Sequence, residues 1–269
     1  MKVYLATKTL EGYLPPLETT ENPAEAEILL VGGKAIRLEE FPRLRGIFKT
    51  GVGTDNLPFA EAEARGIEVG LPSEATREII YEETASFACH LILTALYLGQ
   101  GDWQAWRKAD RPSLSGQRLL VLGTGRIGHR VAARMEGFLK VDTFDTAVNN
   151  SSELEGKMRS CDCVSLHVPL TEETRGLIDA EKLGWLQPRA AIVNTARGAV
   201  IEEAALLQEL RAGRLRAALD VFSEEPYRGE LTEVPSDRLV LTPHIASTCR
   251  EFLEGTARDF TRFMEVTNL

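Results

Sequence analysis

The chain has 269 residues, of which 43% are hydrophobic, and a formal net charge of −9 at pH 7. That length suffices for one large or two small domains with a sizeable core, and the composition is ordinary for a soluble globular protein. Because a net negative charge provides no global positive field, we expect neither nucleic acid nor an anionic membrane as a partner.

The sequence shows no targeting segment and no cluster of metal ligands. The N-terminus MKVYLATKTL is expected to form a strand and lacks the apolar core of a signal peptide. The longest apolar stretch, 85–98, is interrupted by polar residues and is too short to span a bilayer, so a buried helix is expected there. The four cysteines form no C-x-x-C pair, which predicts reduced thiols, no bound metal and a cytoplasmic location.

Short apolar strands separated by helical stretches are predicted in two segments. In the first segment, which ends near residue 83, strands are expected at Lys2–Ala6, Ala26–Val31, Gly46–Lys49 and Ile67–Gly70, followed by a long helix at about Tyr81–Tyr97. In the second, from near Gln117, they are expected at Arg118–Leu122, Lys140–Phe144, Cys163–His167, Ala191–Asn194, Ala217–Asp220 and Leu239–Leu241, with one helix at Ile201–Arg211. Strict alternation of strand and helix predicts an α/β fold with a doubly wound parallel sheet, whose ligand lies at the carboxyl ends of the strands.

A glycine fingerprint follows the first strand of the second segment. Gly123, Gly125 and Gly128 match G-x-G-x-x-G and stand between that strand and a predicted helix. Such glycines permit a tight turn, close approach to a pyrophosphate and close helix packing, and the helix N-terminus offers free N–H groups to the diphosphate. Asp145 lies 17 residues after Gly128, close to the usual spacing for an acid that binds the ribose hydroxyls. Because no Arg or Lys follows Asp145 directly, NAD is favoured over NADP.

Three later strands each end in residues suited to hydride-transfer chemistry. Arg197 follows one strand, Asp220 with Glu224 and Glu225 the next, and His244 the last. A guanidinium holds a substrate carboxylate in a fork and polarises the adjacent carbonyl. An imidazolium protonates the carbonyl oxygen, and a neighbouring carboxylate stabilises the charged imidazole and raises its pKa.

Residue chemistry alone leaves alternatives at several of these positions. His167 also ends a strand near the glycine loop and rivals His244 as the acid–base group. Either glutamate of the 224–225 pair could serve as the acid, and Asp220 could cap the turn that follows it.

Several long motifs in fixed order resemble the D-isomer-specific 2-hydroxyacid dehydrogenase family. The resemblance covers about residues 44 to 250, and the motifs are 49–56 (KTGVGTDN), 164–171 (VSLHVPLT), 194–198 (NTARG), 218–222 (ALDVF) and 242–245 (TPHI). It implies a Rossmann domain at 85–247 that binds the dinucleotide and includes a long inter-domain and dimer helix. It also implies a smaller flavodoxin-like substrate-binding domain at 1–84, to which a C-terminal helix at 248–269 returns.

The resemblance also assigns site residues. It implies Arg197, Glu225 and His244 as the catalytic trio, with Glu225 rather than Glu224 because it stands directly before the proline. The backbone of Val52 and Gly53 would bind the substrate carboxylate together with Arg197 and His244. By its chemistry alone, Lys49 is either only a charge at a strand end or a residue that reaches a second anionic group on the substrate. The implied cofactor contacts, besides the three glycines, are Arg126, Ile127, Asp145, Val168, Pro169, Thr195, Ala196, Asp220 (near the nicotinamide amide) and Ala246.

The implied activity is transfer of a hydride between NAD(H) and a small 2-oxo acid or D-2-hydroxy acid, by a homodimer. The alternative is an NAD-sensing binding protein with little turnover, like the C-terminal-binding-protein corepressors, which residues 82–85 (EETA) also resemble. The chain is shorter than the family pattern, with little room between Asp145 and Cys161 for the usual extra strand and helix.

Overall fold

The computed structural model describes residues 1–102, 104–108, 110–150 and 152–267. The chain divides into two compact units. Unit 1 consists of Met1–Tyr81 and Ser247–Leu269, and unit 2 consists of Glu82–Ala246. The boundaries expected from the sequence, after residues 84 and 247, lie slightly later in the chain than those observed.

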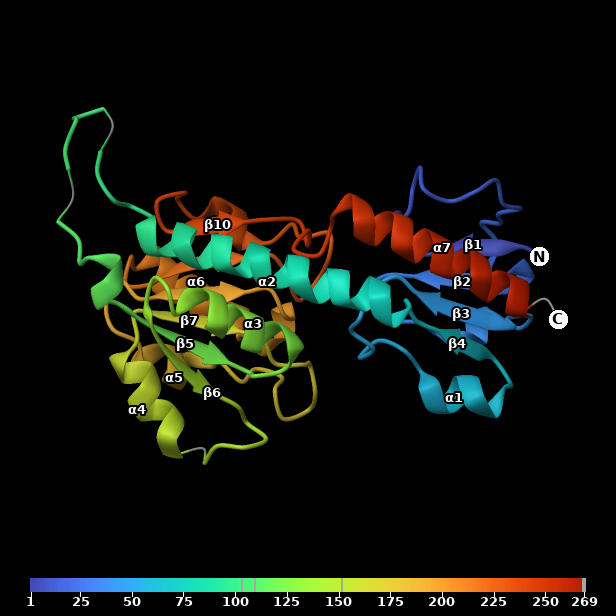
Figure 1. The fold of residues 1–269 in the computed structure, drawn as a ribbon, viewed down its shortest axis with the longest axis horizontal. Coiled ribbons are helices and arrows are strands. Elements are labelled where there is room, and N and C mark those ends of the chain that lie inside the picture. The colour runs from blue at the N-terminus through green and yellow to red at the C-terminus, as the bar shows by residue number, and fades with distance from the viewer. Residues whose placement is uncertain (103, 109, 151, 268–269) are drawn as a thin grey trace. The chain divides into compact units, whose positions relative to one another are not determined.

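Unit 1 contains a parallel four-stranded sheet in the order β1-β2-β3-β4. Its strands are β1 (Val3–Leu5), β2 (Ile28–Val31), β3 (Gly46–Lys49) and β4 (Glu68–Gly70), and its helices include α1 (Phe59–Ala64) and α7 (Arg250–Thr267). Figure 1 shows α1 and α7 on opposite faces of this sheet.

Alternation along the strands of unit 1 supplies a core to each face. Leu29 and Ile47 pack with Ala62 of α1, whereas the intervening Leu30 and Phe48 pack with Phe260 of α7. This is the expected consequence of a side-chain period of two along a strand that is buried on both faces.

Unit 2 contains a parallel six-stranded sheet in the order β10-β9-β8-β7-β5-β6. The strands are β5 (Arg118–Leu122), β6 (Lys140–Phe144), β7 (Cys163–Leu166), β8 (Ala191–Asn194), β9 (Arg216–Leu219) and β10 (Leu239–Leu241). Its helices are the greater part of α2 (Glu74–Tyr97), with α3 (Arg126–Met135), α4 (Ser152–Ser160), α5 (Ala180–Trp185) and α6 (Glu203–Arg211). The strand order reverses between β5 and β7, so the switch point of the doubly wound sheet lies beside β5, the strand that the glycine loop follows.

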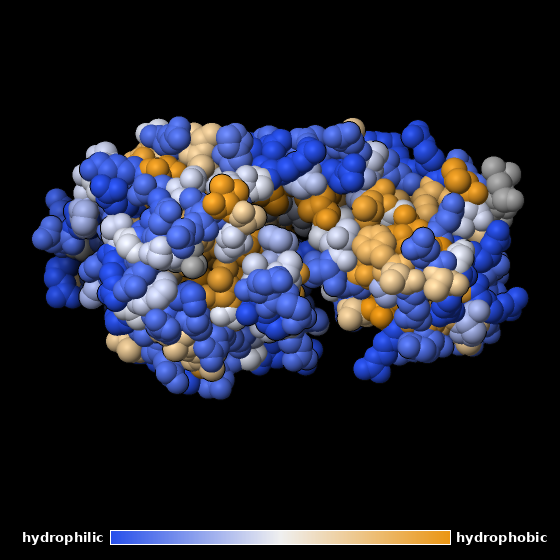
Figure 2. All heavy atoms as spheres, turned by 90° about the horizontal axis from the view of Figure 1, so that it is seen from below, coloured by the Kyte–Doolittle hydropathy of each residue, from blue (hydrophilic) through white to orange (hydrophobic). Residues whose placement is uncertain are grey.

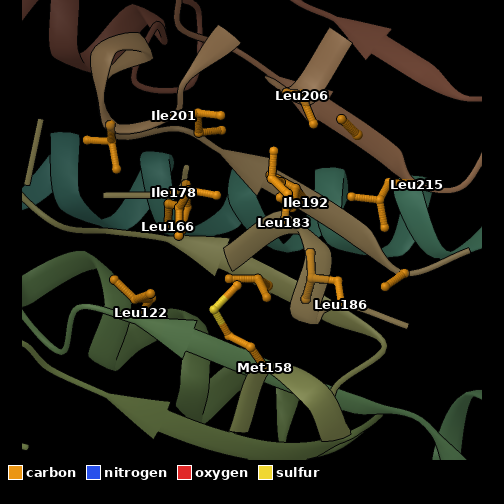
Figure 3. Packing of buried hydrophobic residues seen from close by; sticks show 14 of the residues in the cluster. Leu122, Met158, Leu166, Ile178, Leu183, Leu186, Ile192, Ile201, Leu206 and Leu215 are labelled. Carbon is orange, nitrogen blue, oxygen red and sulfur yellow. The ribbon is translucent and has the colours of Figure 1, made fainter. Parts of the chain in front are cut away.

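Each face of the unit 2 sheet is covered by helices. Leu122, Leu166 and Ile192 of neighbouring strands pack with residues of α4, α5 and α6, as Figure 3 shows for Met158 and Leu183 among others. The residues that alternate with them, such as Leu119 and Val121, pack against α2 and α3. The prediction of a doubly wound α/β fold is confirmed.

The long helix α2 begins seven positions earlier than the sequence predicts, at Glu74 instead of about Tyr81. Its first turn is held within unit 1 by Asp259, whose Oδ2 accepts hydrogen bonds from the Ser73 N–H at 2.8 Å and the Thr76 hydroxyl at 2.7 Å. Ser73 is a local cap as well, since its Oγ accepts from Thr76 N at 3.4 Å, and this signal was missed in the sequence.

Among the described residues, α2 is the one helix long and apolar enough to cross a membrane by length and composition. However, six of its residues (Ala85, Ala88, Leu91, Ile92, Ala95 and Leu96) are buried in the core of unit 2. Core helices of globular proteins meet the same two criteria, so the test is weak support for a membrane span. On the face of the molecule drawn in Figure 2, most side chains are hydrophilic.

Arginine side chains satisfy the carbonyl groups at the ends of several helices. Arg216 of β9 donates to Leu96 O at 3.0 Å and Leu98 O at 3.1 Å, at the end of α2, and its Nε donates to Arg189 O at 2.8 Å. Arg214 and Arg238 do the same for α5 and α6. These contacts satisfy carbonyls that a helix leaves without partners, and the positive charge suits the negative end of the helix dipole.

Replacing Arg216 by Ala should destabilise unit 2. Arg216 is buried, and burial lowers its pKa. Because its guanidinium donates to Leu96 O and Leu98 O, its removal leaves these helix-end carbonyls without donors. We expect a loss of roughly 3 kcal/mol in unfolding free energy, the order of magnitude for unsatisfied buried groups. Denaturation followed by tryptophan fluorescence reports on unit 2, because every Trp of the chain lies within its bounds. The exposed Arg228 provides the control, and equal midpoints for Arg216→Ala and Arg228→Ala would refute the capping role.

Candidate active site

The predicted residues of unit 2 lie at one edge of its sheet, where the parallel strands end. The register aligns Asn194 of β8 with Leu219 of β9, and Leu219 with Leu241 of β10. The loops that carry Arg197, Glu225 and His244 therefore leave three adjacent strands at the same level.

The glycine loop adopts a conformation that requires glycine at two positions. Gly123 has a φ of +97°, and a Cβ there would lie 2.6 Å from His167 O. A Cβ on Gly128 would lie 1.9 Å from Gly123 O, so α3 packs directly on the loop. By contrast, a Cβ on Gly125 would meet nothing within 4 Å. Close packing on one side and open space at the start of α3 are what a bound pyrophosphate needs.

Asp145 follows β6 and is fixed by hydrogen bonds. Its Oδ2 accepts from Thr124 N at 2.7 Å and Thr124 Oγ1 at 2.8 Å, and its Oδ1 accepts from Ala147 N at 3.0 Å. These hydrogen bonds, led by that from Thr124 N, hold the pKa of Asp145 below its ordinary value. Sequence reasoning missed Thr124, although its place between the first two glycines was a signal.

The residues present fit a dinucleotide at this edge. Thr195 is buried and its hydroxyl has no hydrogen-bond partner among the described residues, which is the state expected of a group that meets a ligand. Together with the open face at Gly125 and the oriented carboxylate of Asp145, it supplies polar contacts along the strand ends. The other predicted cofactor residues lie at the same edge, with Arg126 and Ile127 in the first turn of α3, Val168 and Pro169 after β7, Ala196 after β8, and Asp220 and Ala246 after β9 and β10.

His244 and Glu225 are in direct contact. His244 Nδ1 lies 2.8 Å from Glu225 Oε2, and Glu225 Oε1 accepts a hydrogen bond from Phe222 N at 3.1 Å. Burial favours a higher pKa for Glu225, but the hydrogen bond and charge of His244, the Phe222 N–H and the charge of Arg197 outweigh it and lower the pKa. Since Nδ1 faces the carboxylate, Nε2 is the ring nitrogen left for a substrate, and Glu225 rather than Glu224 is the acid that meets the imidazole.

Arg197 lies beside this pair on a loop that is tightly packed. Asn194, which ends β8, donates from Nδ2 to Arg197 O at 2.9 Å and accepts from Ala196 N at 3.0 Å. A Cβ on Gly198 would lie 2.0 Å from the carbonyl carbon of Phe222, so the Arg197 loop rests on the backbone of the Glu225 loop. The sequence places Asn194 in the NTARG motif without indicating a role for it. A polar residue closing a buried apolar strand was the signal.

The rival histidine, His167, has a different environment. Its Nε2 lies 2.8 Å from Ser165 Oγ, and burial lowers its pKa to about 4. At neutral pH this imidazole is therefore uncharged, and among the described residues it contacts no carboxylate of the kind that His244 has.

The remaining predicted residues, Lys49, Val52 and Gly53, lie in unit 1, at the end of β3 and in the loop that follows. Lys49 is buried, and its Nζ donates to Gly32 O at 2.5 Å and to Asn56 Oδ1 at 2.8 Å. Their assignment to substrate binding stays a prediction. No group of three or more potential metal ligands occurs in the part of the chain that the structure describes.

Comparison with known proteins agrees with this geometry. Residues 86–246 match the family described as "D-isomer specific 2-hydroxyacid dehydrogenase, NAD binding domain", and they coincide closely with unit 2. The chain belongs to this family. The resemblance inferred from the sequence motifs is thereby confirmed.

Curated relatives extend the similarity over most of the chain. A glyoxylate reductase of Thermococcus litoralis is 34% identical over 257 residues, which cover 87% of this chain and 77% of the relative. A glycerate dehydrogenase of Methylorubrum extorquens is 31% identical over 264 residues, covering 92% of this chain and 84% of the relative.

Solved structures share the fold. An NADPH-dependent glyoxylate/hydroxypyruvate reductase of Sinorhizobium meliloti, in complex with NADP and malonate, is 26% identical with a TM-score of 0.75, covering 96% of this chain and 90% of that one. A D-lactate dehydrogenase of Aquifex aeolicus, complexed with NAD and lactic acid, has a TM-score of 0.79 at 23% identity, covering 99% and 95%. The chain is an NAD(P)-dependent 2-hydroxyacid dehydrogenase, and its unit 2 is the NAD-binding domain.

Replacing Gly198 by Ala should impair turnover severely. The added Cβ overlaps the Phe222 backbone and forces apart the loops that carry Arg197 and Glu225. A displacement of about 1 Å in such groups is expected to lower kcat/KM roughly 10²-fold. Gly116 is the matched control, because a Cβ there meets only Ser113 Oγ at 3.5 Å. If Gly198→Ala and Gly116→Ala show the same kcat/KM, the two loops are not coupled.

Proposed function

We propose that this enzyme reduces small 2-oxo acids to D-2-hydroxy acids with NADH, using Arg197, Glu225 and His244. Arg197 holds the substrate carboxylate, His244 is the general acid–base and Glu225 stabilises its protonated form. The observation that carries the proposal is the 2.8 Å contact between His244 Nδ1 and Glu225 Oε2, with the charge of Arg197 close enough to lower the pKa of Glu225.

Each residue has a chemical task in this proposal. When bound, the nicotinamide supplies or accepts the hydride. The guanidinium of Arg197 forms paired hydrogen bonds with the substrate carboxylate and so fixes the adjacent carbonyl. His244 Nε2 donates its proton to the carbonyl oxygen during reduction and takes it back during oxidation, while Glu225 holds Nδ1.

The preference for NAD over NADP rests on Asp145. Asp145 directly follows β6, where the ribose of a bound dinucleotide lies in this fold, and two hydrogen bonds from Thr124 fix its carboxylate. The low pKa of Asp145 keeps it negatively charged, which favours ribose hydroxyls and disfavours a 2′-phosphate.

Glyoxylate and hydroxypyruvate are the substrates we propose to test first. Relatives of this chain include glyoxylate reductases and the hydroxypyruvate reductase of Thermotoga maritima, which is 34% identical over 229 residues. Both compounds carry the carboxylate and carbonyl that Arg197 and His244 would bind.

Steady-state kinetics with a panel of 2-oxo acids, each with NADH and with NADPH, tests this function. We expect NADH-dependent turnover of at least one small 2-oxo acid. NADH binding without turnover of any panel member would instead support the corepressor-like alternative. In the EETA segment, which suggested the corepressor-like alternative, Glu82 forms ion pairs with Arg130 and Arg134 of α3.

We further propose that the enzyme is a cytoplasmic homodimer. The four cysteines are free thiols, which suits a reducing compartment. Trp106 is 74% exposed and follows the end of α2 in the chain. Tryptophan is enriched at protein–protein interfaces, and this exposed side chain is what supports the proposed dimer. Light scattering would measure the mass in solution.

His244→Ala should lower kcat by about 10²-fold or more, the usual contribution of a general acid. NADH affinity should stay unchanged, because the imidazole is assigned to the substrate rather than the cofactor. His129→Ala serves as the control, since His129 is an exposed histidine of α3. A near-wild-type kcat for His244→Ala would mean that the proton donor is misassigned.

Glu225→Gln should alter the pH profile of reduction. Reduction requires the protonated imidazole, and the low pKa of Glu225 keeps the carboxylate charged throughout the working pH range, so it stabilises that proton. The neutral amide removes this stabilisation. The high-pH limb of kcat/KM for reduction should therefore move to lower pH by about one pH unit. An unchanged limb would contradict the electrostatic role of Glu225.

A further inference from the structure

The loop that carries Glu225 contains a tyrosine whose hydroxyl is bound to helix α6. Tyr227 donates from this hydroxyl to Glu203 Oε1 at 2.6 Å, and the hydroxyl oxygen accepts from Leu231 N at 3.2 Å. Glu203 is the first residue of α6, and the apolar side chains of that helix pack in the core of unit 2. The hydroxyl therefore joins the loop to a packed helix that lies outside it.

The ring of Tyr227 is held as well as its hydroxyl. It stacks on the ring of Phe222, with the ring centroids 4.5 Å apart and an angle of 25° between the planes. Both rings pack against the core of unit 2, and stacking of this kind adds to the free energy of burial. A Cβ on Gly229 would lie 2.3 Å from the Tyr227 hydroxyl, so the chain passes closely beside this side chain.

Phe222 connects this tyrosine to the proposed acid–base pair. Its N–H donates to Glu225 Oε1 at 3.1 Å, and Glu225 Oε2 lies 2.8 Å from His244 Nδ1. Between residues 223 and 228 no backbone N–H donates a hydrogen bond to another group that the structure describes. The loop therefore depends on its side chains to keep the Glu225 carboxylate in place.

We propose that Tyr227 and Glu203 are positioning residues, which hold the carboxylate of Glu225 in reach of the imidazole. The hydrogen bond to α6 fixes the Tyr227 ring, the ring supports Phe222, and the Phe222 N–H holds one oxygen of the carboxylate. Both residues act through Glu225 and are assigned no contact with substrate or cofactor. This role rests on the proposed function, in which Glu225 stabilises the protonated imidazole.

The surroundings of Tyr227 keep its hydroxyl protonated. Burial and the hydrogen bond to Glu203 raise the pKa of Tyr227 to about 12, and the charge of Glu230 acts in the same direction. The phenol therefore donates to Glu203 and accepts from Leu231 N throughout the working pH range. A phenylalanine would keep the stacked ring but would leave the carboxylate of Glu203 without this donor.

Substitutions that separate the hydroxyl from the ring test this proposal. Tyr227→Phe removes the donor, Glu203→Ala removes the acceptor, and Glu203→Gln retains a carbonyl oxygen that accepts. In Tyr227→Phe and Glu203→Ala we expect kcat/KM for reduction to fall roughly tenfold, the scale of one hydrogen bond to a charged group. Glu203→Gln should restore most of the wild-type value, and the Kd for NADH should stay unchanged in all three. The exposed residues Tyr13 and Glu202 provide matched controls, Tyr13→Phe and Glu202→Ala.

The pH profile distinguishes positioning from a general loss of stability. Because the pair acts through Glu225, Tyr227→Phe should move the high-pH limb of kcat/KM for reduction to lower pH, as expected for Glu225→Gln. In the Glu225→Gln background, Tyr227→Phe should cause no further movement of the limb. Equal movements with and without the Glu225 carboxylate would overturn the proposal. An unmoved limb in both Tyr227→Phe and Glu203→Ala would also overturn it.

Titration of Glu225 provides a readout that does not depend on turnover. Burial favours a higher pKa for Glu225, but its hydrogen bonds and the charges of His244 and Arg197 lower the pKa. NMR of the labelled carboxyl carbon should show this pKa rising in Tyr227→Phe, because the carboxylate moves away from these groups. A wild-type pKa of Glu225 in that variant would contradict the positioning role. If the wild-type enzyme turns over no 2-oxo acid, the proposed function fails, and this titration alone decides whether Tyr227 holds the carboxylate.

Discussion

The parallel register of β8, β9 and β10 is the constraint on which the candidate site depends. Because Asn194, Leu219 and Leu241 are aligned across the three strands, the residues that follow them begin their loops at one level. The contacts between Asp220 and Thr242, and between Asp220 N and Asn194 O, are direct consequences of this alignment. A slip of one residue in one strand would turn the inward side chains of that strand outward and separate the loops.

Buried polar residues convert this alignment into a defined site. Asn194 and Asp220 each close an apolar strand and bind the backbone of the loop that carries Arg197 or His244. Glycines at 123, 128 and 198 permit contacts between loops that a Cβ would prevent. Burying polar groups is unfavourable unless each is satisfied, and here the same hydrogen bonds that satisfy them hold the neighbouring loops in place.

Local patterns were sufficient for the strands and for the glycine loop. The strands β5, β6, β8 and β10 have the predicted bounds, and β5, β8 and β10 are short apolar runs closed by a turn signal. The start of α2 was placed wrongly because the local cap of Ser73 was missed, while Asp259, distant in sequence, adds hydrogen bonds that no local pattern indicates. Likewise, α6 begins at Glu203 rather than Ile201, since Ile201 forms a bridge with Ile178 in another loop.

From the sequence alone, the family, the doubly wound fold and the residue types at each strand end could be determined. These features depend on local hydrophobic patterns, glycine spacing and motif order. The family motif already favoured Glu225 over Glu224, and the structure shows its contact with His244. Only the tertiary structure decided that Thr124 orients Asp145 and that the Asp220 carboxylate binds the His244 loop. These contacts join residues of separate strands and loops, so their distances and burial exist only after the sheet has formed.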